Sequence, residues 1–271
     1  MKYEKGKGRT EDGGKKKIML VSPHLDDAVF SVGGLMAALA EEGYELHLVT
    51  CFTRSVLNPT GFALACQLDK GLAAEVDYME LRRQEDREAC RLLHAQPHWL
   101  DLPEAPHRGY ESASALFQDI LEEDKIQPAL VERLRESADD LAPDLILSPV
   151  GIGNHVDHQQ VKQAVSTLQR ELTETLFLHW YDEPYLSRHP EAYPDKLKKA
   201  VGLAWKILQQ QAGLAEKEVT SISVAPYWEQ KMSACAAYTT QIGFQFGGKE
   251  KMREVLAKKI RGTDSFTELV A

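Results

Sequence analysis

The chain has 271 residues, 43% of them hydrophobic, and a formal net charge of −9. A chain of this length can bury a large core, and it contains no run of the roughly 20 apolar residues that a membrane-spanning helix needs. Its acidic balance argues against binding to nucleic acid, which relies on clustered lysine and arginine. We therefore expect a water-soluble protein with no membrane insertion and no nucleic-acid partner, and its composition is compatible with a homo-oligomer.

The first 17 residues are polar and glycine-rich, and they carry a short basic run but no apolar signal segment. They predict a flexible N-terminal tail, 1–17. No Cys-x-x-Cys pair occurs among the four cysteines, Cys51, Cys66, Cys90 and Cys235. Neither a disulfide framework nor a thiolate zinc site is therefore expected, and a reduced, cytoplasmic location fits best.

The next segments alternate between strand and helix patterns. The apolar run 18–21 predicts a buried strand, the spacing of apolar residues over 33–42 predicts a helix, and 45–52 predicts a second strand. A strand, a helix and a strand in this order favour a parallel α/β sheet. Segment 53–71 lacks clear periodicity and predicts a long loop that shapes a substrate pocket at one end of the sheet.

Later patterns continue the α/β alternation, and the part after 185 is expected to be helical with polar connections. No internal repeat or linker is present, so one domain over 18–271 is predicted. Further strands are expected at 97–103, 145–150 and 176–181, and further helices at 77–94, 113–122, 129–140 and 159–172.

Two clusters of histidine and aspartate follow two of the predicted strands. His24 and Asp27 come after 18–21, and His158 comes after 145–150. Parallel sheets bind ligands beyond the carboxyl ends of their strands, so both clusters belong at the same edge. Two imidazoles and one carboxylate are the ligand set of many hydrolytic zinc centres, with a position left for water. The cofactor expected here is Zn²⁺, and another divalent transition metal would fit the same set.

The remaining polar residues of the clusters suit the chemistry around such a metal. Asp26 can face the bound water as a general base while its neighbour faces the metal. His155 could protonate a leaving amine or stabilise an oxyanion, and Asp157 could hold an imidazole in one tautomer. The alternative is that Asp26 or Asp27 only caps the next helix, and that the second cluster is only a polar helix start.

The motifs resemble those of the PIG-L/LmbE family of zinc-dependent N-acetylglucosaminyl deacetylases. Residues 23–28 read Pro-His-Leu-Asp-Asp-Ala where the family has Pro-His-Pro-Asp-Asp-Glu, and 155–158 read His-Val-Asp-His, which matches its His-x-Asp-His. The helix pattern that starts at Arg82 lies between them, as in the family. The resemblance runs in order over about 18–185 and more loosely beyond.

The resemblance implies a Rossmann-like three-layer fold and a deacetylase domain over 18–271. It also implies zinc bound by His24, Asp27 and His158, with Asp26 as the base and His155 as the partner of the tetrahedral intermediate or the leaving group. Leu25 and Ala28 depart from the family motif, which puts substrate contacts in doubt more than catalysis.

Candidate substrate-binding residues are less sharply indicated. Arg54, Arg82 and Arg108 could each reach a sugar hydroxyl or an acidic substituent, although ion-paired or solvated arginines are the ordinary alternative. Some relatives place a tyrosine before the later histidine motif to steady an oxyanion, and this chain has glycine-rich sequence there. Asn154 or Tyr185 could substitute for that tyrosine.

The leading hypothesis is hydrolysis of an N-acyl group, most often acetyl, from a small-molecule amino sugar or its conjugate by metal-activated water. A second hypothesis keeps the zinc hydrolase but assigns another small amide or ester. A third is a noncatalytic Rossmann-like binding protein, but the Gly-x-Gly-x-x-Gly dinucleotide fingerprint is missing after the first strand.

Overall fold

The computed structural model describes residues 16–195, 197–199, 219–257 and 267–271. The predicted tail, 1–17, lies outside these ranges except for its last two residues, and Lys17 already belongs to the first strand. No helix in the described ranges is both long and apolar enough to span a membrane.

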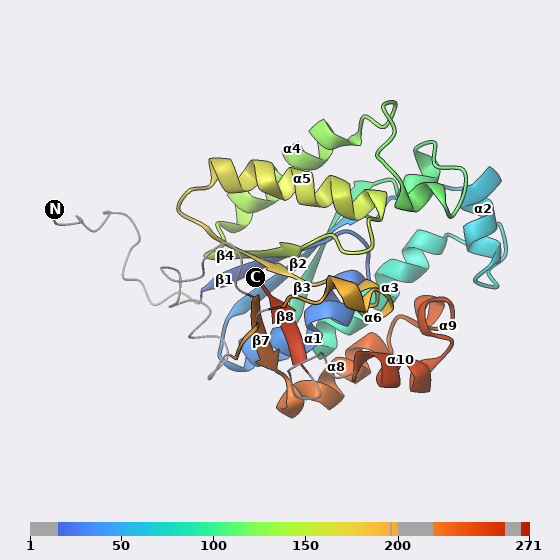
Figure 1. Ribbon diagram of the computed structural model, residues 1–271. Coiled ribbons are helices and arrows are strands. Elements are labelled where there is room, and N and C mark those ends of the chain that lie inside the picture. The colour runs from blue at the N-terminus through green and yellow to red at the C-terminus, as the bar shows by residue number, and fades with distance from the viewer. Residues whose placement is uncertain (1–15, 196, 200–218, 258–266) are drawn as a thin grey trace.

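The described residues form one sheet of eight strands in the order β3-β2-β1-β4-β5-β8-β7-β6 (Figure 1). β1 pairs in parallel with β2 and β4, and the outer pairs β2·β3 and β4·β5 are also parallel. Strand β8 is antiparallel to both β5 and β7. The predicted mostly parallel α/β sheet is therefore confirmed. The strands are β1 (Lys17–Ser22), β2 (Glu45–Phe52), β3 (Ala95–Leu102), β4 (Leu145–Pro149), β5 (Leu176–Trp180), β6 (Leu197–Lys199), β7 (Val219–Ser223) and β8 (Thr267–Val270).

Helices cover both faces of the sheet and make three layers (Figure 1). Helices α4 (Ile126–Leu141) and α5 (Val156–Glu171) lie on one face. The other face carries α1 (Asp27–Glu41), α3 (Tyr78–Leu92) and α8 (Trp228–Cys235), and beyond them α9 (Thr239–Phe246) and α10 (Lys249–Leu256). Because the central strands are buried on both sides, they are nearly continuous apolar runs rather than alternating ones.

Short helices complete the chain near the carboxyl ends of the strands and in the connections. They are α2 (Gly61–Leu68), α6 (Tyr185–Arg188) and the 3₁₀ turns η1 (Ala105–His107), η2 (Ala115–Phe117), η3 (Pro190–Ala192) and η4 (Ala225–Tyr227).

Three sequence predictions are corrected by these elements. The expected loop 53–71 contains α2, and the expected helix 113–122 is a loop with only the single turn η2. The part after 185 contributes strands β6, β7 and β8 as well as helices. Buried polar residues in β7 and β8 explain the last error, because Thr220, Ser221 and Glu268 conceal the apolar pattern that marks a strand.

Helix α1 is bent at Val32, whose φ and ψ of −128° and 23° are not helical. Beyond the bend, the N–H groups of Gly34 and Leu35 donate to Glu268 of β8 at 2.8 and 2.7 Å. The Lys231 ammonium donates to the same carboxylate at 2.7 Å, and both side chains are buried. Position 34 needs glycine, because a Cβ would lie 2.5 Å from its nearest side-chain neighbour. Strand β8 thus fixes the helix that starts at Asp27.

The buried carboxyl group of Asp86 is expected to make stability depend on pH. It accepts hydrogen bonds from Trp99 Nε1 and the Tyr238 hydroxyl, and burial raises its pKa from 3.8 to about 7. The folded state therefore keeps this proton after the unfolded chain has released it. The contribution of protonated Asp86 to the free energy of unfolding is complete below pH 3.8 and is lost as the pH rises through about 7. Asp86→Asn, which stays neutral, should lose less stability than wild type over this range.

Urea unfolding at a series of pH values measures this difference. The matched control is Asp139→Asn, which changes an exposed carboxylate of α4. Parallel pH profiles for wild type and Asp86→Asn would show that Asp86 does not carry the effect.

Candidate metal centre and active site

The two His/Asp clusters meet at the carboxyl edge of the sheet. Strands β1 and β4 are hydrogen-bonded neighbours, and the chain leaves β1 for β2 on one side and leaves β4 for β5 on the other. Crevices at such a change of direction are the usual ligand sites of open α/β sheets. The segment after β1 supplies His24, Asp26 and Asp27, and the start of α5 supplies His155 and His158.

His24, Asp27 and His158 converge on one point, as the predicted metal ligands would. Asp27 Oδ2 lies 3.1 Å from His24 Nδ1 and 3.2 Å from His158 Nε2. All three candidate ligand atoms lie within 4.8 Å of one another. His158 Nε2 is fully buried and has no hydrogen-bond partner among the described residues. An orphaned imidazole nitrogen facing a carboxylate is the arrangement that a bound cation would satisfy.

Both imidazoles are held on their far side by a second carboxylate. His24 Nε2 lies 2.9 Å from Asp157 Oδ2, and His158 Nδ1 lies 2.7 Å from Asp182 Oδ1. Such partners fix the tautomer that leaves the other nitrogen free for a metal. Asp157 thus lies where a tautomer-fixing carboxylate would be. Asp182 was missed as a site residue, and its signal was an acidic residue two positions after the end of the strand beside β4.

A second group, His24, His155 and Asp157, also brings its ligand atoms within 4.8 Å. In that group the carboxylate is already engaged, because Asp157 accepts hydrogen bonds from Arg108 at 2.7 Å and from the Ala105 N–H at 3.1 Å. A metal placed there would also leave His158 Nε2 unsatisfied. We therefore prefer the set that contains Asp27 and His158.

The charges of the protein groups at this site favour an ionised Asp27 carboxylate. Burial opposes ionisation of Asp27, but the neighbouring His158 and His24 hold its pKa well below the usual range. Burial also opposes the charge on His158, while Asp27 and Asp182 raise its pKa to about 9. Because ligands must be deprotonated, a cation that binds here has to displace protons from the imidazoles.

Asp26 lies beside the ligands without joining them. Its side chain is buried, caps no helix N–H, and lies 3.4 Å from Arg82 Nη2. Burial, together with the negative charge of Asp27, raises the pKa of Asp26 to about 6. The capping alternative therefore has no support at this residue, and a carboxyl that titrates near neutrality suits proton transfer.

His155 starts helix α5 and faces the same centre. Its Nδ1 accepts a hydrogen bond from the Asp157 N–H at 3.2 Å, and its ring lies 5.1 Å from that of His24. Burial, with the neighbouring His24, lowers the pKa of His155 to about 3. The ring is therefore neutral, and with Nδ1 as acceptor it carries its proton on Nε2.

Four of the predicted substrate-binding residues have different surroundings. Arg54 is exposed and pairs with Asp101 at 3.4 Å. Arg82 is buried between Asp26 and Glu104, so its guanidinium is already paired within the protein. The Asn154 amide donates to the Phe117 carbonyl at 3.5 Å, and the Tyr185 ring lies 5.2 Å from that of His158.

Arg108, which the sequence indicated only as a candidate substrate contact, is ion-paired with carboxylates of the site. It donates to Asp157 and to Asp124, at 2.7 and 3.0 Å. Burial opposes ionisation of Asp157, but the Arg108 guanidinium and the His24 hydrogen bond hold its pKa well below the usual range. Arg108 therefore keeps Asp157 charged and able to orient His24.

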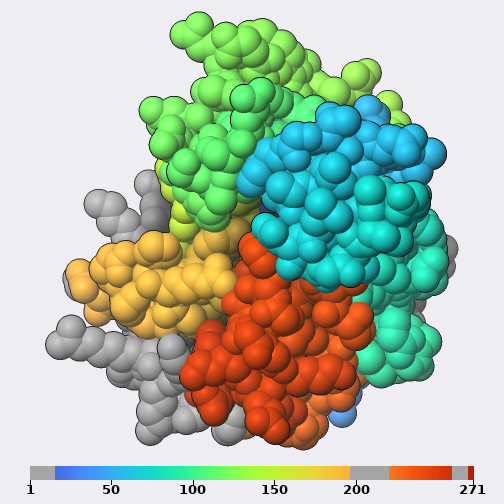
Figure 2. Space-filling model, turned by 90° about the vertical axis from the view of Figure 1, so that its right-hand side faces the viewer, coloured from blue at the N-terminus to red at the C-terminus, as the bar shows by residue number. Residues whose placement is uncertain are grey.

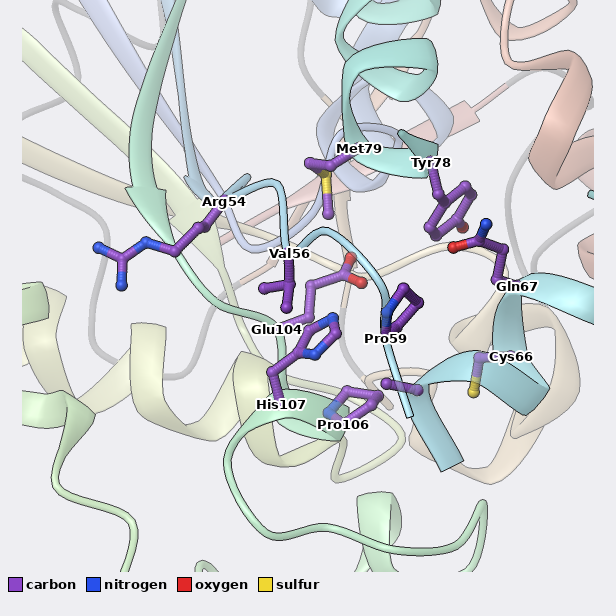
Figure 3. A pocket seen from close by; sticks show the side chains of 11 residues that line it. Arg54, Val56, Pro59, Cys66, Gln67, Tyr78, Met79, Glu104, Pro106 and His107 are labelled. Atoms are coloured by element: carbon purple, nitrogen blue, oxygen red, sulfur yellow. The ribbon is translucent and has the colours of Figure 1, made fainter. Parts of the chain in front are cut away.

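A hollow of about 400 Å³, including solvent at its mouth, lies on the far side of the Arg82–Glu104 ion pair from Asp26 (Figure 3). Figure 3 shows it between the loop after β2, helix α2, the start of α3 and the turn η1. Glu104 lines the hollow and binds Arg82, which in turn contacts Asp26. Segment 53–71 supplies part of the lining of this hollow, and its role in substrate binding stays a prediction.

The family model PIG-L, described as GlcNAc-PI de-N-acetylase, matches residues 19–169, which is more than half of the chain. The chain belongs to the PIG-L family. The predicted resemblance is therefore confirmed, and PIG-L membership agrees with the predicted enzyme class, an amide hydrolase that removes acyl groups.

Two curated relatives share a name. The 2′-N-acetylparomamine deacetylase of Streptomyces fradiae is 32% identical over 225 residues, which cover 82% of this chain and 76% of that protein. The enzyme of the same name from Niallia circulans is 28% identical over 255 residues, covering 86% and 83%. The solved A40926 pseudoaglycone deacetylase matches with a TM-score of 0.74 and 22% identity over 95% of this chain and 96% of that one. This last likeness shows the shared fold.

Asp182→Asn is expected to weaken metal binding about 10- to 100-fold. Asp182 Oδ2 accepts the N–H groups of Gly151 and Ile152, so the amide oxygen of asparagine should take that side. The amide NH₂ would then donate to His158 Nδ1 and move the ring proton to Nε2, where it blocks ligation. Competition with a chelating indicator measures the affinity. Asp101→Asn, at an exposed carboxylate, is the control, and equal affinities for both variants would contradict the role of Asp182.

Proposed function

We propose that the protein is a zinc-dependent hydrolase that removes an acetyl group from the nitrogen of an amino sugar or its conjugate. The observation that carries this proposal is the convergence of His24, Asp27 and His158 beside a second buried carboxyl group, that of Asp26. Two imidazoles and a carboxylate with a separate base nearby are the parts of a metal-assisted amide hydrolase. Two curated relatives named 2′-N-acetylparomamine deacetylases support the amino-sugar class.

Zinc, when bound to these three ligands, would acidify a water molecule and polarise the amide carbonyl. Asp26 accepts the proton of the attacking water, since its carboxylate lies beside the ligands and outside their set. Arg82, at 3.4 Å, orients that carboxylate and keeps part of it ionised. The C–N bond then breaks, and the nitrogen leaves as an amine after gaining a proton.

His155 is the proton or hydrogen-bond donor in this proposal. Its Nδ1 is committed to the Asp157 N–H, so Nε2–H is the ring group that can donate to the developing oxyanion or to the leaving nitrogen. Asp157 and Asp182 take no part in proton transfer and hold the two ligand imidazoles.

Release of acetate tests the proposal. Zinc-loaded protein should free acetate from 2′-N-acetylparomamine or from methyl N-acetylglucosaminide, and a chelator should stop the release. If acetate appears only from simple N-acetyl amides or acetyl esters, the enzyme is a zinc hydrolase of another substrate class. If no acetate appears from any of these while zinc is bound, the proposal is wrong.

Two further expectations remain proposals. We infer a cytoplasmic location because all four cysteines are free thiols and three of them are buried. We also infer that residues 18–271 act as one deacetylase domain, since the strands on both sides of β8 belong to one sheet.

A further inference from the structure

The segment 109–121 lies over the start of α5 and borders the site. Figure 2 looks onto the face where this green segment meets the blue segment with α2, the yellow segment with α6 and the red helix α9. The Tyr110 hydroxyl closes the segment by accepting the Leu121 N–H and donating to Asp124. The segment is therefore an anchored part of the surface.

Side chains of α5 and the loop before it attach the turn η2 to the site. The Asn154 amide donates to the Phe117 carbonyl at 3.5 Å, and Gln159 Nε2 donates to the Gln118 carbonyl at 3.1 Å. These bonds hold Phe117 above the residue that starts α5, His155.

Phe117 is at once a site residue and a surface residue. Its ring lies 5.3 Å from that of His155 and 6.2 Å from that of Tyr185, in edge-to-face arrangements. Yet Phe117 is 43% exposed. Phe244 is also strongly exposed, but Lys70 lies over its ring, 4.7 Å from the centroid. Among the described aromatic side chains, Phe117 combines exposure with contact to the proposed catalytic ring.

We propose that Phe117 is the platform on which the ring of the substrate's acetylated sugar stacks, and that it sets the preference for sugars over small amides. This inference rests on the proposed function. His155 contacts the nitrogen or oxygen of the scissile amide in that function, and the carbon attached to this nitrogen belongs to the sugar ring. A sugar ring joined there lies over the neighbouring Phe117.

The chemistry of the two surfaces agrees. The flat C–H face of a pyranose carries small positive partial charges, and the face of a phenyl ring is negative. Aromatic walls with a few directed polar groups are typical of small-molecule sites. The contact would be the same in the ground state and the transition state, so its loss should raise KM and leave kcat nearly unchanged.

The kinetic test compares Phe117→Ala with Phe117→Tyr in the zinc-loaded enzyme. With 2′-N-acetylparomamine, Phe117→Ala should raise KM about tenfold with kcat changed less than about twofold, and Phe117→Tyr should restore KM. With acyclic N-acetylethanolamine, Phe117→Ala should match wild type. Phe244→Ala is the control for removing an exposed phenyl group. Equal losses on the cyclic and acyclic substrates, or a fall in kcat alone, would overturn the platform.

A binding test separates this inference from the proposed function. Calorimetry with 2′-N-acetylparomamine uses Asp26→Asn protein, in which turnover is expected to be very slow, with and without Phe117→Ala. Binding that weakens about tenfold without Phe117 supports the platform even if wild type releases no acetate, in which case only the proposed reaction fails. Binding that is absent, or equal in both proteins, overturns the platform whatever the wild type hydrolyses.

Discussion

His158→Ala should leave the purified protein without its metal and without activity. Among the described residues, His158 supplies the one fully buried ring nitrogen of the site that has no hydrogen-bond partner, and its removal leaves only His24 and Asp27 as ligands. Structural and catalytic zinc sites use at least three protein ligands. We expect metal content to fall from about one ion per chain to near zero, measured by elemental analysis after dialysis.

His155→Ala is the matched control, because His155 belongs to the other group of candidate ligands. It should keep the metal and lose rate. Loss of metal in His155→Ala together with retention in His158→Ala would place the ion at His24, His155 and Asp157, and would overturn the preferred ligand set.

Asp26→Asn should produce the opposite pattern, with full metal content and very slow turnover. Asparagine keeps the shape of the side chain and a contact to Arg82, but it cannot accept the proton of the attacking water. Because a positioned base contributes about 10²- to 10⁴-fold, kcat should fall within that range. The measurements are acetate release under saturating substrate and metal content of the same sample.

The thermal midpoint of Asp26→Asn decides whether a lower rate reflects chemistry or misfolding. We expect little change, since the variant removes a negative charge that burial disfavours. Turnover equal to wild type would remove Asp26 from the role of base and leave Glu104, the other partner of Arg82, as the nearby acidic group to test.

The position of the metal site could be predicted because the carboxyl ends of parallel strands lie at the same edge of a sheet. His24 and Asp27 follow one buried strand and His158 follows another, so the alternation of strands and helices was enough to bring them together. Asp157, the second partner of His24, was predicted as a carboxylate that holds an imidazole, but the pairing of Asp182 with His158 was not predicted. Asp182 reaches His158 only because the loop 151–154 folds around its carboxylate, which depends on two positive-φ glycines and on Tyr185 packing against Gly153.

The prediction of a helix at 113–122 was wrong for a clear physical reason. Its apolar residues are spaced like one face of a helix, but Leu116 and Ile120 pack against Tyr110 in a small separate cluster. The short turn η2 satisfies these contacts and leaves Phe117 facing outward. Local spacing could not distinguish a small cluster under a loop from a helix on the main core.

Strand β8 also constrains how the protein can fold as it is synthesised. A chain made only as far as residue 266 contains the residues of the five parallel strands and of both metal clusters, but it lacks the strand β8 that pairs with β5. The bend in α1 likewise lacks the carboxylate of Glu268 for its two free N–H groups. Such an open edge recruits other strands, so a nascent chain on the ribosome is most prone to aggregate just before residues 267–271 emerge.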